Sequence, residues 1–358
     1  MKSKRIKLVL NIITLVILGL VVYSSREDLG NVATELSDAN LFLLLLFIPL
    51  QALNYHAYAR MYQETFNLLG EKVGYWDMVK VSTEMSFVNY VFPSAGISGF
   101  GYFSLRMRSL GVRGVRSTMA QTLRWGIVLA SFIPVLGLGV LLLALRNQAN
   151  NMVVLAASGL AFGVLILIML VGFLLEQHNG LRNFTFFVLE KVEIVVNFFK
   201  KKKVDLLNKE RRGKITRNFS RLEKDYRAVR GNWKGFAYTC RWGVLANLTE
   251  VMTIGVCFMA LGAEPVWGAI IVSYGVANIG SFIGILPGGH GVYEALMTAV
   301  LVSAGVPAGL SLTAVLTYRL VTTVLYVPPG YYFYSKAIAE TKGMEKLLAE
   351  EENNKKTS

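Results

Sequence analysis

The sequence predicts an all-α polytopic membrane protein made of two inverted repeats. Hydrophobic residues occupy 54% of the 358 positions and charged residues 17%, whereas soluble domains carry about 25% charged residues. The apolar residues lie in runs comparable to the about 20 helical residues needed to cross a bilayer. Two of these runs are broken by proline and glycine, one in each half of the chain, and the halves share the same order of runs and breaks.

Six unbroken apolar stretches predict full membrane spans, although the first could also be a secretory signal. Lys2, Lys4 and Arg5 precede this first stretch, which ends at Tyr23 without the small-residue cleavage site of a signal peptide. We therefore expect an uncleaved first span. The six stretches are residues 6–23, 39–59, 117–145, 152–175, 236–261 and 308–334.

Two further apolar stretches, 78–110 and 267–304, are interrupted near their middles. The first break contains Pro93 and Gly96, and the second runs from Pro287 to Gly291. Proline ends a helix at the preceding residue, and glycine frees the backbone to turn. Each stretch is predicted to form a re-entrant hairpin, which gives about six spans and two hairpins; two short spans per stretch, hence eight or more in all, are the alternative.

The distribution of basic residues predicts how the spans are oriented. Lysine and arginine are concentrated before the first span, around the first hairpin, in the block 182–234 and in the C-terminal tail. The segments predicted on the other side keep only Arg26 and Arg146. The positive-inside rule therefore places both termini in the cytoplasm. The membrane is expected to be the plasma membrane of a prokaryote. The net charge of +14 follows from this pattern, so no nucleic-acid partner is expected.

The segment 176–235 is predicted to be a basic cytoplasmic linker. Residues 184–199 have the pattern of an interfacial amphipathic helix, and residues 208–230 that of a mixed-charge helix. A solvated cytoplasmic loop without specific lipid binding is an equal alternative for the whole segment 176–235. The tail 336–358 is charged, and its part from 345 onward is expected to be disordered. Anionic lipids are expected to bind the basic end of the amphipathic helix, Lys200, Lys201, Lys202 and Lys203.

Matched residues in the two halves predict the internal repeat. The first unit is 39–145 and the second 236–335, so the predicted transmembrane domain covers 1–335. Chance similarity between apolar segments is the alternative. Because the hairpins open to opposite sides in the predicted topology, the repeats are expected to be inverted, as in alternating-access transporters. The matches include Trp76 with Trp267, Pro93 with Pro287, Gly111 with Gly305 and Arg124 with Arg319.

Arg124 and Arg319 are predicted to lie within membrane helices. An arginine there costs at least ~2.5–3.5 kcal/mol, so each should face a partner or a wet cavity. A pair of guanidinium groups can bind a phosphate bidentately. The alternative is an ion pair, for which Glu84, Glu250 and Glu294 are the candidate acids. Glu84 is also one turn from Lys80 and expected to pair with it, whereas Arg241 and Glu250 each need a partner on another helix.

The second break is the most informative segment. Glycines that follow Pro287 let backbone N–H groups converge at the start of a half-helix, which favours an anion. Glu294 lies one turn into that helix. The alternative to a role in the site is an acid that only stabilises the helix start through the helix dipole. The first break has no acid, so the halves are not equivalent. The candidate lipid-binding residues are Arg124, Arg319, Glu294, His290, Pro287, Gly288, Gly289, Gly291, Glu84, Pro93 and Gly96.

These motifs resemble the membrane domain of the lysylphosphatidylglycerol synthase family, which also occurs alone as flippase-like proteins. The resemblance covers about 6 to 334 and rests on the run from Leu286 through Glu294, on Gly305 and Arg319, and on the upstream segment from Phe92 to Arg124. It implies a flippase that moves a phospholipid between leaflets by alternating access, such as aminoacylated phosphatidylglycerol or another anionic or glycosylated lipid. Arg124, Arg319, Glu294 and the turn 287–291 would line the lipid path.

The resemblance also implies what this chain lacks. Full-length members carry a soluble aminoacyltransferase domain after the membrane region, and the residues after 334 are too few for it. We therefore expect no enzyme, no catalytic residues, no metal and no cofactor; Cys240 and Cys257 lie on one predicted helix and cannot pair. The alternatives are a membrane-embedded lipid headgroup transferase, a small-solute transporter and a scaffold for an envelope lipid enzyme. Whether the chain forms a homo-oligomer stays open.

Overall fold

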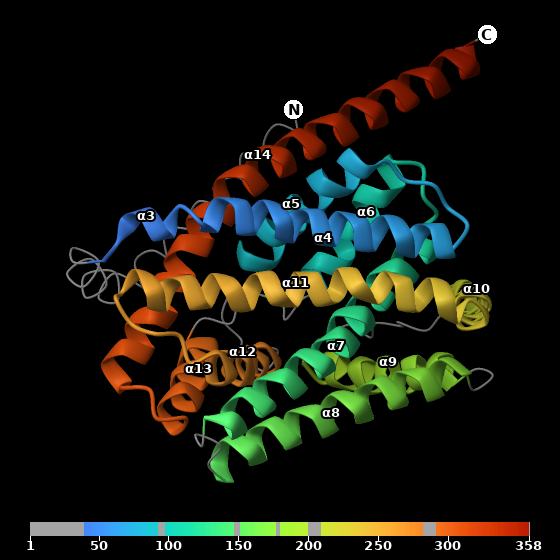
Figure 1. Cartoon of the computed structure of the whole chain (residues 1–358). Helices are drawn as coiled ribbons and strands as arrows, with labels where there is room; N and C mark the ends of the chain where they lie inside the picture. The colour runs from blue at the N-terminus through green and yellow to red at the C-terminus, as the bar shows by residue number, and fades with distance from the viewer. Residues whose placement is uncertain are drawn as a thin grey trace.

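The structure, a computed structural model, describes residues 39–91, 97–146, 151–176, 180–199, 209–281 and 291–357 (Figure 1). Within these ranges the regular secondary structure is entirely helical, which confirms the all-α prediction. The predicted first span, 6–23, lies outside the described residues.

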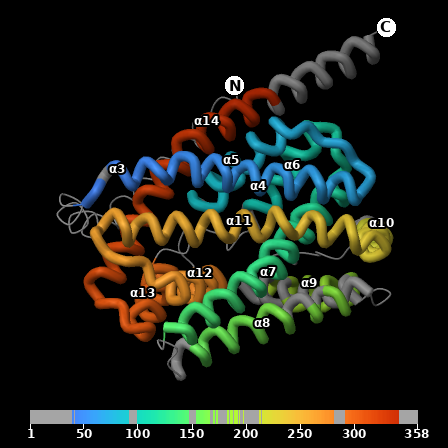
Figure 2. The backbone as a smooth tube through the Cα atoms, in the orientation of Figure 1, coloured from blue at the N-terminus to red at the C-terminus, as the bar shows by residue number. Residues whose placement is uncertain are grey.

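The first half contains α3 (Leu41–Leu44), α4 (Phe47–Leu68), α5 (Tyr75–Val91), α6 (Ile97–Ser109) and α7 (Gly114–Leu145). Three helices link the halves: α8 (Asn151–Glu176), α9 (Gly180–Phe199) and α10 (Lys209–Gly231). The second half contains α11 (Trp233–Ala260), α12 (Trp267–Ser281), α13 (Val292–Ser303) and α14 (Ala308–Thr357). The backbone trace shows α4 and α11 lying side by side across the middle of the molecule (Figure 2).

Four helical stretches are long and apolar enough to cross a membrane. They are Phe42–Leu68, Gly114–Leu145, Trp233–Ala260 and Ala308–Glu340, and they match four of the six predicted spans. A fifth prediction, 152–175, coincides with α8. The chain is therefore a polytopic membrane protein. The helices of the two interrupted stretches are shorter, with 17 and 13 residues in α5 and α6 and 15 and 12 in α12 and α13. A full span needs about 20 residues, so these lengths fit both a hairpin and a pair of short spans, and the hairpins stay a prediction.

Matched glycines end the corresponding helices of the two halves in the same way. Gly70 after α4 has φ of 71° and Gly262 after α11 has φ of 73°; Gly111 after α6 has 82° and Gly305 after α13 has 89°. L-residues with a side chain rarely adopt this left-handed conformation, so glycine is required at each point. After Gly70, the N–H of Glu71 donates to the carbonyl of Phe66 at 2.9 Å. After Gly262, the N–H of Ala263 donates to the carbonyl of Phe258 at the same distance.

The two halves are inverted with respect to each other. The start of α11 meets the end of α4, where Gly235 lies against Leu68. At the opposite end, the N–H of Asn40 donates to the carbonyl of Ala260 at 2.8 Å. Therefore α4 and α11, which occupy the same position in the two repeats, run antiparallel. Their contact is the most extensive between any two described helices.

Each broken pair of helices packs against the long helix of the other half. α5 contacts α14, and α12 contacts α7. Small residues let α12 and α7 approach closely: a Cβ added at Gly139 would lie 2.7 Å from Ile271, and one at Gly268 would lie 2.6 Å from the carbonyl oxygen of Gly139. Such close backbone approach is how helices pack in a membrane, where hydrophobic burial between helices gives little stabilisation.

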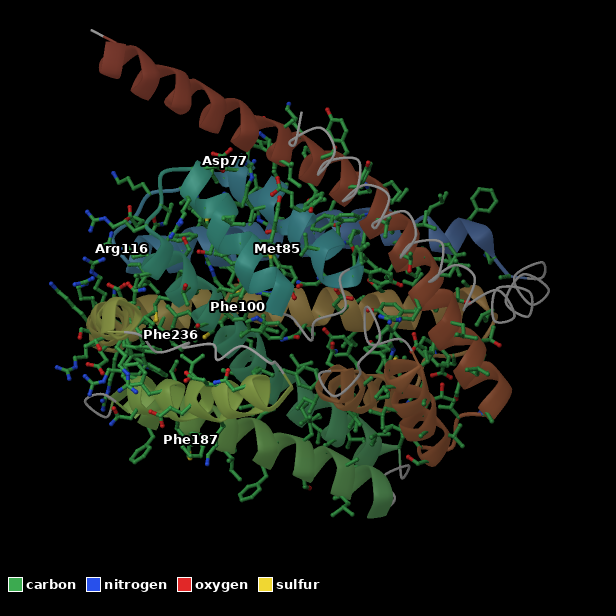
Figure 3. The ribbon with its side chains drawn as sticks, turned by 180° about the vertical axis from the view of Figure 1, so that it is seen from behind. Asp77, Met85, Phe100, Arg116, Phe187 and Phe236 are labelled. Carbon is green, nitrogen blue, oxygen red and sulfur yellow. The ribbon has the colours of Figure 1, made fainter. Side chains whose placement is uncertain are left out.

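Ion pairs tie both ends of α7 to matching loops. Arg116, at its start, lies 2.6 Å from Glu71 in the loop after α4, and Arg146, at its end, lies 2.7 Å from Glu264 in the loop after α11. Because these loops correspond in the inverted repeats, they mark opposite ends of the molecule. Seen from behind, nitrogen-bearing side chains gather at the end that carries Arg116 (Figure 3). This is the end that the charge distribution predicts to be cytoplasmic.

The linker and the tail agree with the predictions in part. Helix α9 covers the predicted helical segment 184–199, and α10 covers the predicted segment 208–230 from Lys209 onward. Arg212 of α10 lies 3.2 Å from Glu190 of α9. The four lysines 200–203 lie outside the described residues. The prediction of disorder from 345 onward was wrong, because α14 continues to Thr357. That segment is rich in Glu and Lys and contains Leu347, Leu348 and Ala349, all residue types that favour helix.

The packing of α7 on α12 yields a stability test. Gly139→Leu should lower the stability of the protein by on the order of 1–3 kcal/mol, because the added side chain overlaps Ile271 and the backbone of α12. The matched control is Gly137→Leu, two residues away on the same helix, where an added Cβ meets nothing within 4 Å. The midpoint of thermal unfolding in detergent is the measurement. Equal loss of stability in both variants would contradict the packing described here.

Candidate functional site

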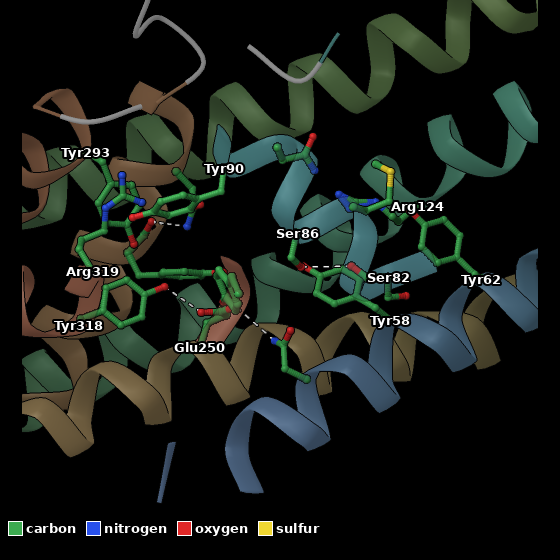
Figure 4. Close-up of a pocket in the computed structure, with 16 residues that line it drawn as sticks. Tyr58, Tyr62, Ser82, Ser86, Tyr90, Arg124, Glu250, Tyr293, Tyr318 and Arg319 are labelled. Atoms are coloured by element: carbon green, nitrogen blue, oxygen red, sulfur yellow. Dashed lines mark hydrogen bonds between the residues drawn. The ribbon is translucent and has the colours of Figure 1, made fainter. Parts of the chain in front are cut away.

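A cavity of about 250 Å³ lies between the two halves, with residues of both in its lining (Figure 4). α4, α5 and α7 contribute from the first half, and α11, α12, α13 and α14 from the second. Its polar side chains include an arginine from each half. Tyrosine is the commonest lining residue, with Tyr58, Tyr62, Tyr90, Tyr274, Tyr293, Tyr318 and Tyr326.

Arg124 borders the cavity from α7 without an acidic partner among the described residues. Its guanidinium carbon lies 5.3 Å from the ring centroid of Tyr58, 6.0 Å from that of Tyr62 and 4.8 Å from that of Trp125. Its Nε is buried and makes no hydrogen bond in the described structure. The electron-rich rings offset part of the positive charge. The predicted ion pair is therefore not formed by Arg124, and its guanidinium group is available to an anion.

Arg319 borders the same cavity from α14 but is paired. Its Nε donates to Oε1 of Glu294 at 2.7 Å, and Oε2 of Glu294 accepts the N–H of Gly291 at 2.7 Å. Both side chains are mostly buried. Tyr293 and Tyr90 add ring contacts to the guanidinium group, at 4.7 and 5.5 Å. For Arg319 and Glu294, both alternatives from the sequence hold: the residues form an ion pair, and the acid stabilises the start of α13.

The two halves differ at the position of this acid. Glu294 stands the same number of residues before Gly305 as Phe100 stands before Gly111. The first half therefore has no carboxylate in the place from which Glu294 pairs with Arg319. This substitution explains why the matched arginines, Arg124 and Arg319, have different surroundings.

Glu250 of α11 also lines the cavity, and neutral groups surround it. Its Oε2 accepts the hydroxyl of Tyr318 at 2.8 Å, and its Oε1 accepts the hydroxyl of Tyr326 at 3.1 Å and Nδ2 of Asn54 at 3.2 Å. The expectation of a partner on another helix is thus correct, because Asn54 belongs to α4 and both tyrosines to α14. In the described structure no lysine, arginine or histidine lies within ion-pair distance of it.

Asn54 and the tyrosines were missed by sequence reasoning. A usable signal existed: Tyr58 and Tyr62 are one turn apart on α4, and Tyr318 and Tyr326 lie two turns apart beside Arg319. Tyrosines at helical spacing in a membrane helix suggest a polar face. Tyrosines also serve as anchors at the membrane interface, so their presence alone does not indicate a polar face.

Glu84 does not line the cavity, although its neighbours Ser82 and Ser86 do. It pairs instead with Arg106 of α6 at 3.1 Å and accepts the hydroxyl of Tyr102 at 2.8 Å. The expected pair with Lys80 was wrong. Lys80 is half-exposed and lies 4.0 Å from Asp77, whereas Glu84 is buried against α6, where an arginine is the nearer cation.

Arg241 also departs from expectation. It stacks on two residues of its own helix, with its guanidinium carbon 3.4 Å from the ring centroid of Tyr238 and 4.6 Å from that of Trp242. The predicted partner on another helix is therefore absent among the described residues, because Arg241 lies on the exposed surface of α11, where solvation replaces an ion pair.

Several predicted site residues lie outside the described structure. They are Pro93 and Gly96 in the first break, and Pro287, Gly288, Gly289 and His290 in the second. Their relation to the cavity stays a prediction. Gly291, the last residue of the second break, is described and holds Glu294 through its N–H group.

The fold and the cavity define a class: an all-α polytopic membrane protein whose two inverted halves enclose a polar site. A family model described as Lysylphosphatidylglycerol synthase TM region matches residues 9–330, so the chain belongs to that family. Over 123 residues it is 28% identical to a UPF0104 membrane protein of Methanothermobacter thermautotrophicus. This match covers 33% of the present chain and 37% of that relative, little more than a third of its length.

The paired arginine gives a second stability test. Glu294→Ala should destabilise the protein by about 3–5 kcal/mol, because it leaves the buried guanidinium group of Arg319 without its counter-charge. Glu264→Ala is the control, since its pair with Arg146 is exposed and worth less than about 1 kcal/mol. Thermal unfolding in detergent would be compared for both, and for Glu294→Ala combined with Arg319→Leu. The combination should recover much of the loss; purely additive effects would argue against the pair.

Proposed function

We propose that this protein moves a phospholipid between leaflets, with the headgroup passing through the cavity between the two halves. One observation carries the proposal: the cavity is bordered by matched arginines from the two inverted halves, Arg124 and Arg319, and the described structure gives Arg124 no acid. A guanidinium group binds a phosphate with two parallel hydrogen bonds. A phosphate at Arg124 would offset a charge that is otherwise costly within the membrane.

The inverted architecture supports a transport mechanism. Two halves of opposite orientation provide two related arrangements, one open to each side, around a site near their junction. The phosphate would first bind at Arg124. For Arg319 to bind it in turn, the phosphate would have to displace the carboxylate of Glu294. The acyl chains would remain in the bilayer while the headgroup crosses.

The predicted orientation places the end with Arg116 and Glu71 in the cytoplasm and the end with Arg146 and Glu264 outside. The plasma membrane, the cytoplasmic termini and the re-entrant hairpins belong to this proposal. So does an attraction of anionic lipids to the lysines 200–203. The family description suggests aminoacylated phosphatidylglycerol among the candidate substrates, with other anionic or glycosylated lipids as alternatives.

A headgroup transferase has less support. Such an enzyme needs a base beside its nucleophile. The described lining of the cavity contains neither histidine nor cysteine, so the carboxylate of Glu250 would have to be the base. Among the residues that the structure describes, His56 is the one histidine. Its Nδ1 forms a hydrogen bond with the hydroxyl of Tyr75 at 2.7 Å, and neither residue lines the cavity. No particular observation favours a scaffold or a small-solute transporter.

Arg124 offers the sharpest test of transport. Purified protein would be reconstituted into liposomes with labelled phosphatidylglycerol, and movement of label between leaflets would be followed. Arg124→Ala should slow movement about 10- to 100-fold, which corresponds to the loss of a charge-assisted hydrogen bond. Arg124→Lys should be intermediate, because lysine keeps the charge but not the two-pronged geometry.

The control variant is Arg146→Ala, which removes an exposed arginine at the end of the same helix and should transport normally. Arg124 makes no ion pair in the described structure, so its removal leaves no carboxylate uncompensated. Movement no faster than in empty vesicles, across anionic and aminoacylated lipids, would exclude a flippase. Normal transport by Arg124→Ala would exclude its role as phosphate ligand.

A further inference from the structure

The charges that line the cavity do not cancel in pairs. Glu294 neutralises Arg319, at 2.7 Å. Two charges of opposite sign are left: Arg124, which has no acidic partner in the described chain, and Glu250, which has no basic one. Both line the same cavity but make no ion pair with each other. An isolated charge is costly in a membrane interior, so Arg124 and Glu250 each favour a ligand group of opposite charge.

The surroundings of Glu250 suit a cation. The three hydrogen bonds to the carboxylate come from neutral groups, so they hold it in place without removing its charge. Tyr318 and Tyr326 contact it through their hydroxyl groups, and Tyr58 lines the same cavity. A carboxylate attracts an ammonium group, and the neighbouring hydroxyl and amide oxygens can accept its remaining hydrogen bonds. One carboxylate supplies one negative charge, which matches a singly charged cation.

The carboxylate of Glu250 and the guanidinium group of Arg124 lie at different places in the cavity. In the close-up, Arg319 and Arg124 lie toward opposite sides of the cavity, and Glu250 lies between them beside Tyr318 (Figure 4). A ligand bound at Arg124 through an anionic group could therefore place a second group toward Glu250. That second group would be cationic.

We infer that Glu250, Tyr318 and Tyr326 form a binding site for a singly charged cation, most simply an ammonium group, next to the anion site at Arg124. The cation has two sources: an amine on the same lipid headgroup, or a free monovalent ion that binds together with an anionic headgroup. The inference rests on the proposed transport function for its biological role, but binding at the site is measurable without transport.

The test measures binding of headgroups to the purified full chain in detergent by calorimetry. Glycerophosphoethanolamine carries a phosphate and an ammonium group, and glycerophosphoglycerol carries the phosphate alone. If the headgroup supplies the cation, the first should bind about tenfold more tightly than the second, the value of one charge-assisted contact. If a free ion supplies it, sodium should strengthen binding of glycerophosphoglycerol by a similar factor. Glu250→Gln should abolish either preference, while the exposed control Glu264→Gln keeps it.

A second variant guards against misfolding of Glu250→Gln. Tyr318→Phe combined with Tyr326→Phe removes two hydroxyl groups of the site and leaves the carboxylate, so the preference for the cation should weaken but persist. Its disappearance in this variant would overturn the assignment. So would equal affinity of the unmodified protein for both headgroups with no effect of sodium, or a cation preference that survives Glu250→Gln.

The two proposals fail separately. If liposomes show no lipid movement but the cation preference depends on Glu250, transport is excluded and the cation site stands. If lipid moves and Glu250→Gln leaves every preference unchanged, the cation site is excluded and transport stands.

Discussion

The antiparallel packing of α4 on α11 is the interaction on which the rest of this structure depends. It is fixed near its middle by Asn54, whose Nδ2 donates to the carbonyl of Ala246 at 3.3 Å, to the hydroxyl of Thr249 at 2.8 Å and to Glu250 at 3.2 Å. A buried amide satisfied by the opposite helix specifies one register, because any slip would leave polar groups unpaired in an apolar region. With this register set, residues from corresponding helices of the two halves meet around one cavity.

The exchange of helices between the halves follows from the same arrangement. α5 packs on α14 and α12 packs on α7, and all four of these helices contribute residues to the lining of the cavity. The arginines lie on the long helices, and the short helices of the opposite repeat pack against those helices. A rearrangement of one broken pair would therefore shift the surroundings of the other half's arginine. This mechanical connection is what the proposed alternation between two open states requires.

The sequence was informative where a position admits few residue types. A left-handed backbone requires glycine, so Gly111 and Gly305 were among the matched positions from which the repeat was predicted, and Gly70 and Gly262 add a second such pair. An arginine within a span is costly enough to mark a site, which identified Arg124 and Arg319. The choice of partner was not predictable in this way. Glu84 pairs with Arg106 and not with Lys80, because the side of α5 that carries Glu84 packs against α6. Which side of a helix faces its neighbour depends on packing and cannot be read from spacing along the chain.

Backbone symmetry and charge symmetry are separate properties, and this protein keeps only the first. Counted from the matched glycines, Glu250 corresponds to Tyr58 and Glu294 to Phe100. The acid that lines the cavity and the acid that pairs with Arg319 therefore both belong to the second half. The arginines correspond almost position for position. One half therefore holds its arginine in an ion pair and supplies a second carboxylate, while the other leaves its arginine open. Two inverted halves with equal charges would offer a ligand the same site from either side. With unequal charges, an anionic group favours the Arg124 end in the arrangement described here. Transfer toward Arg319 would then be limited by the free energy needed to separate Glu294 from its partner.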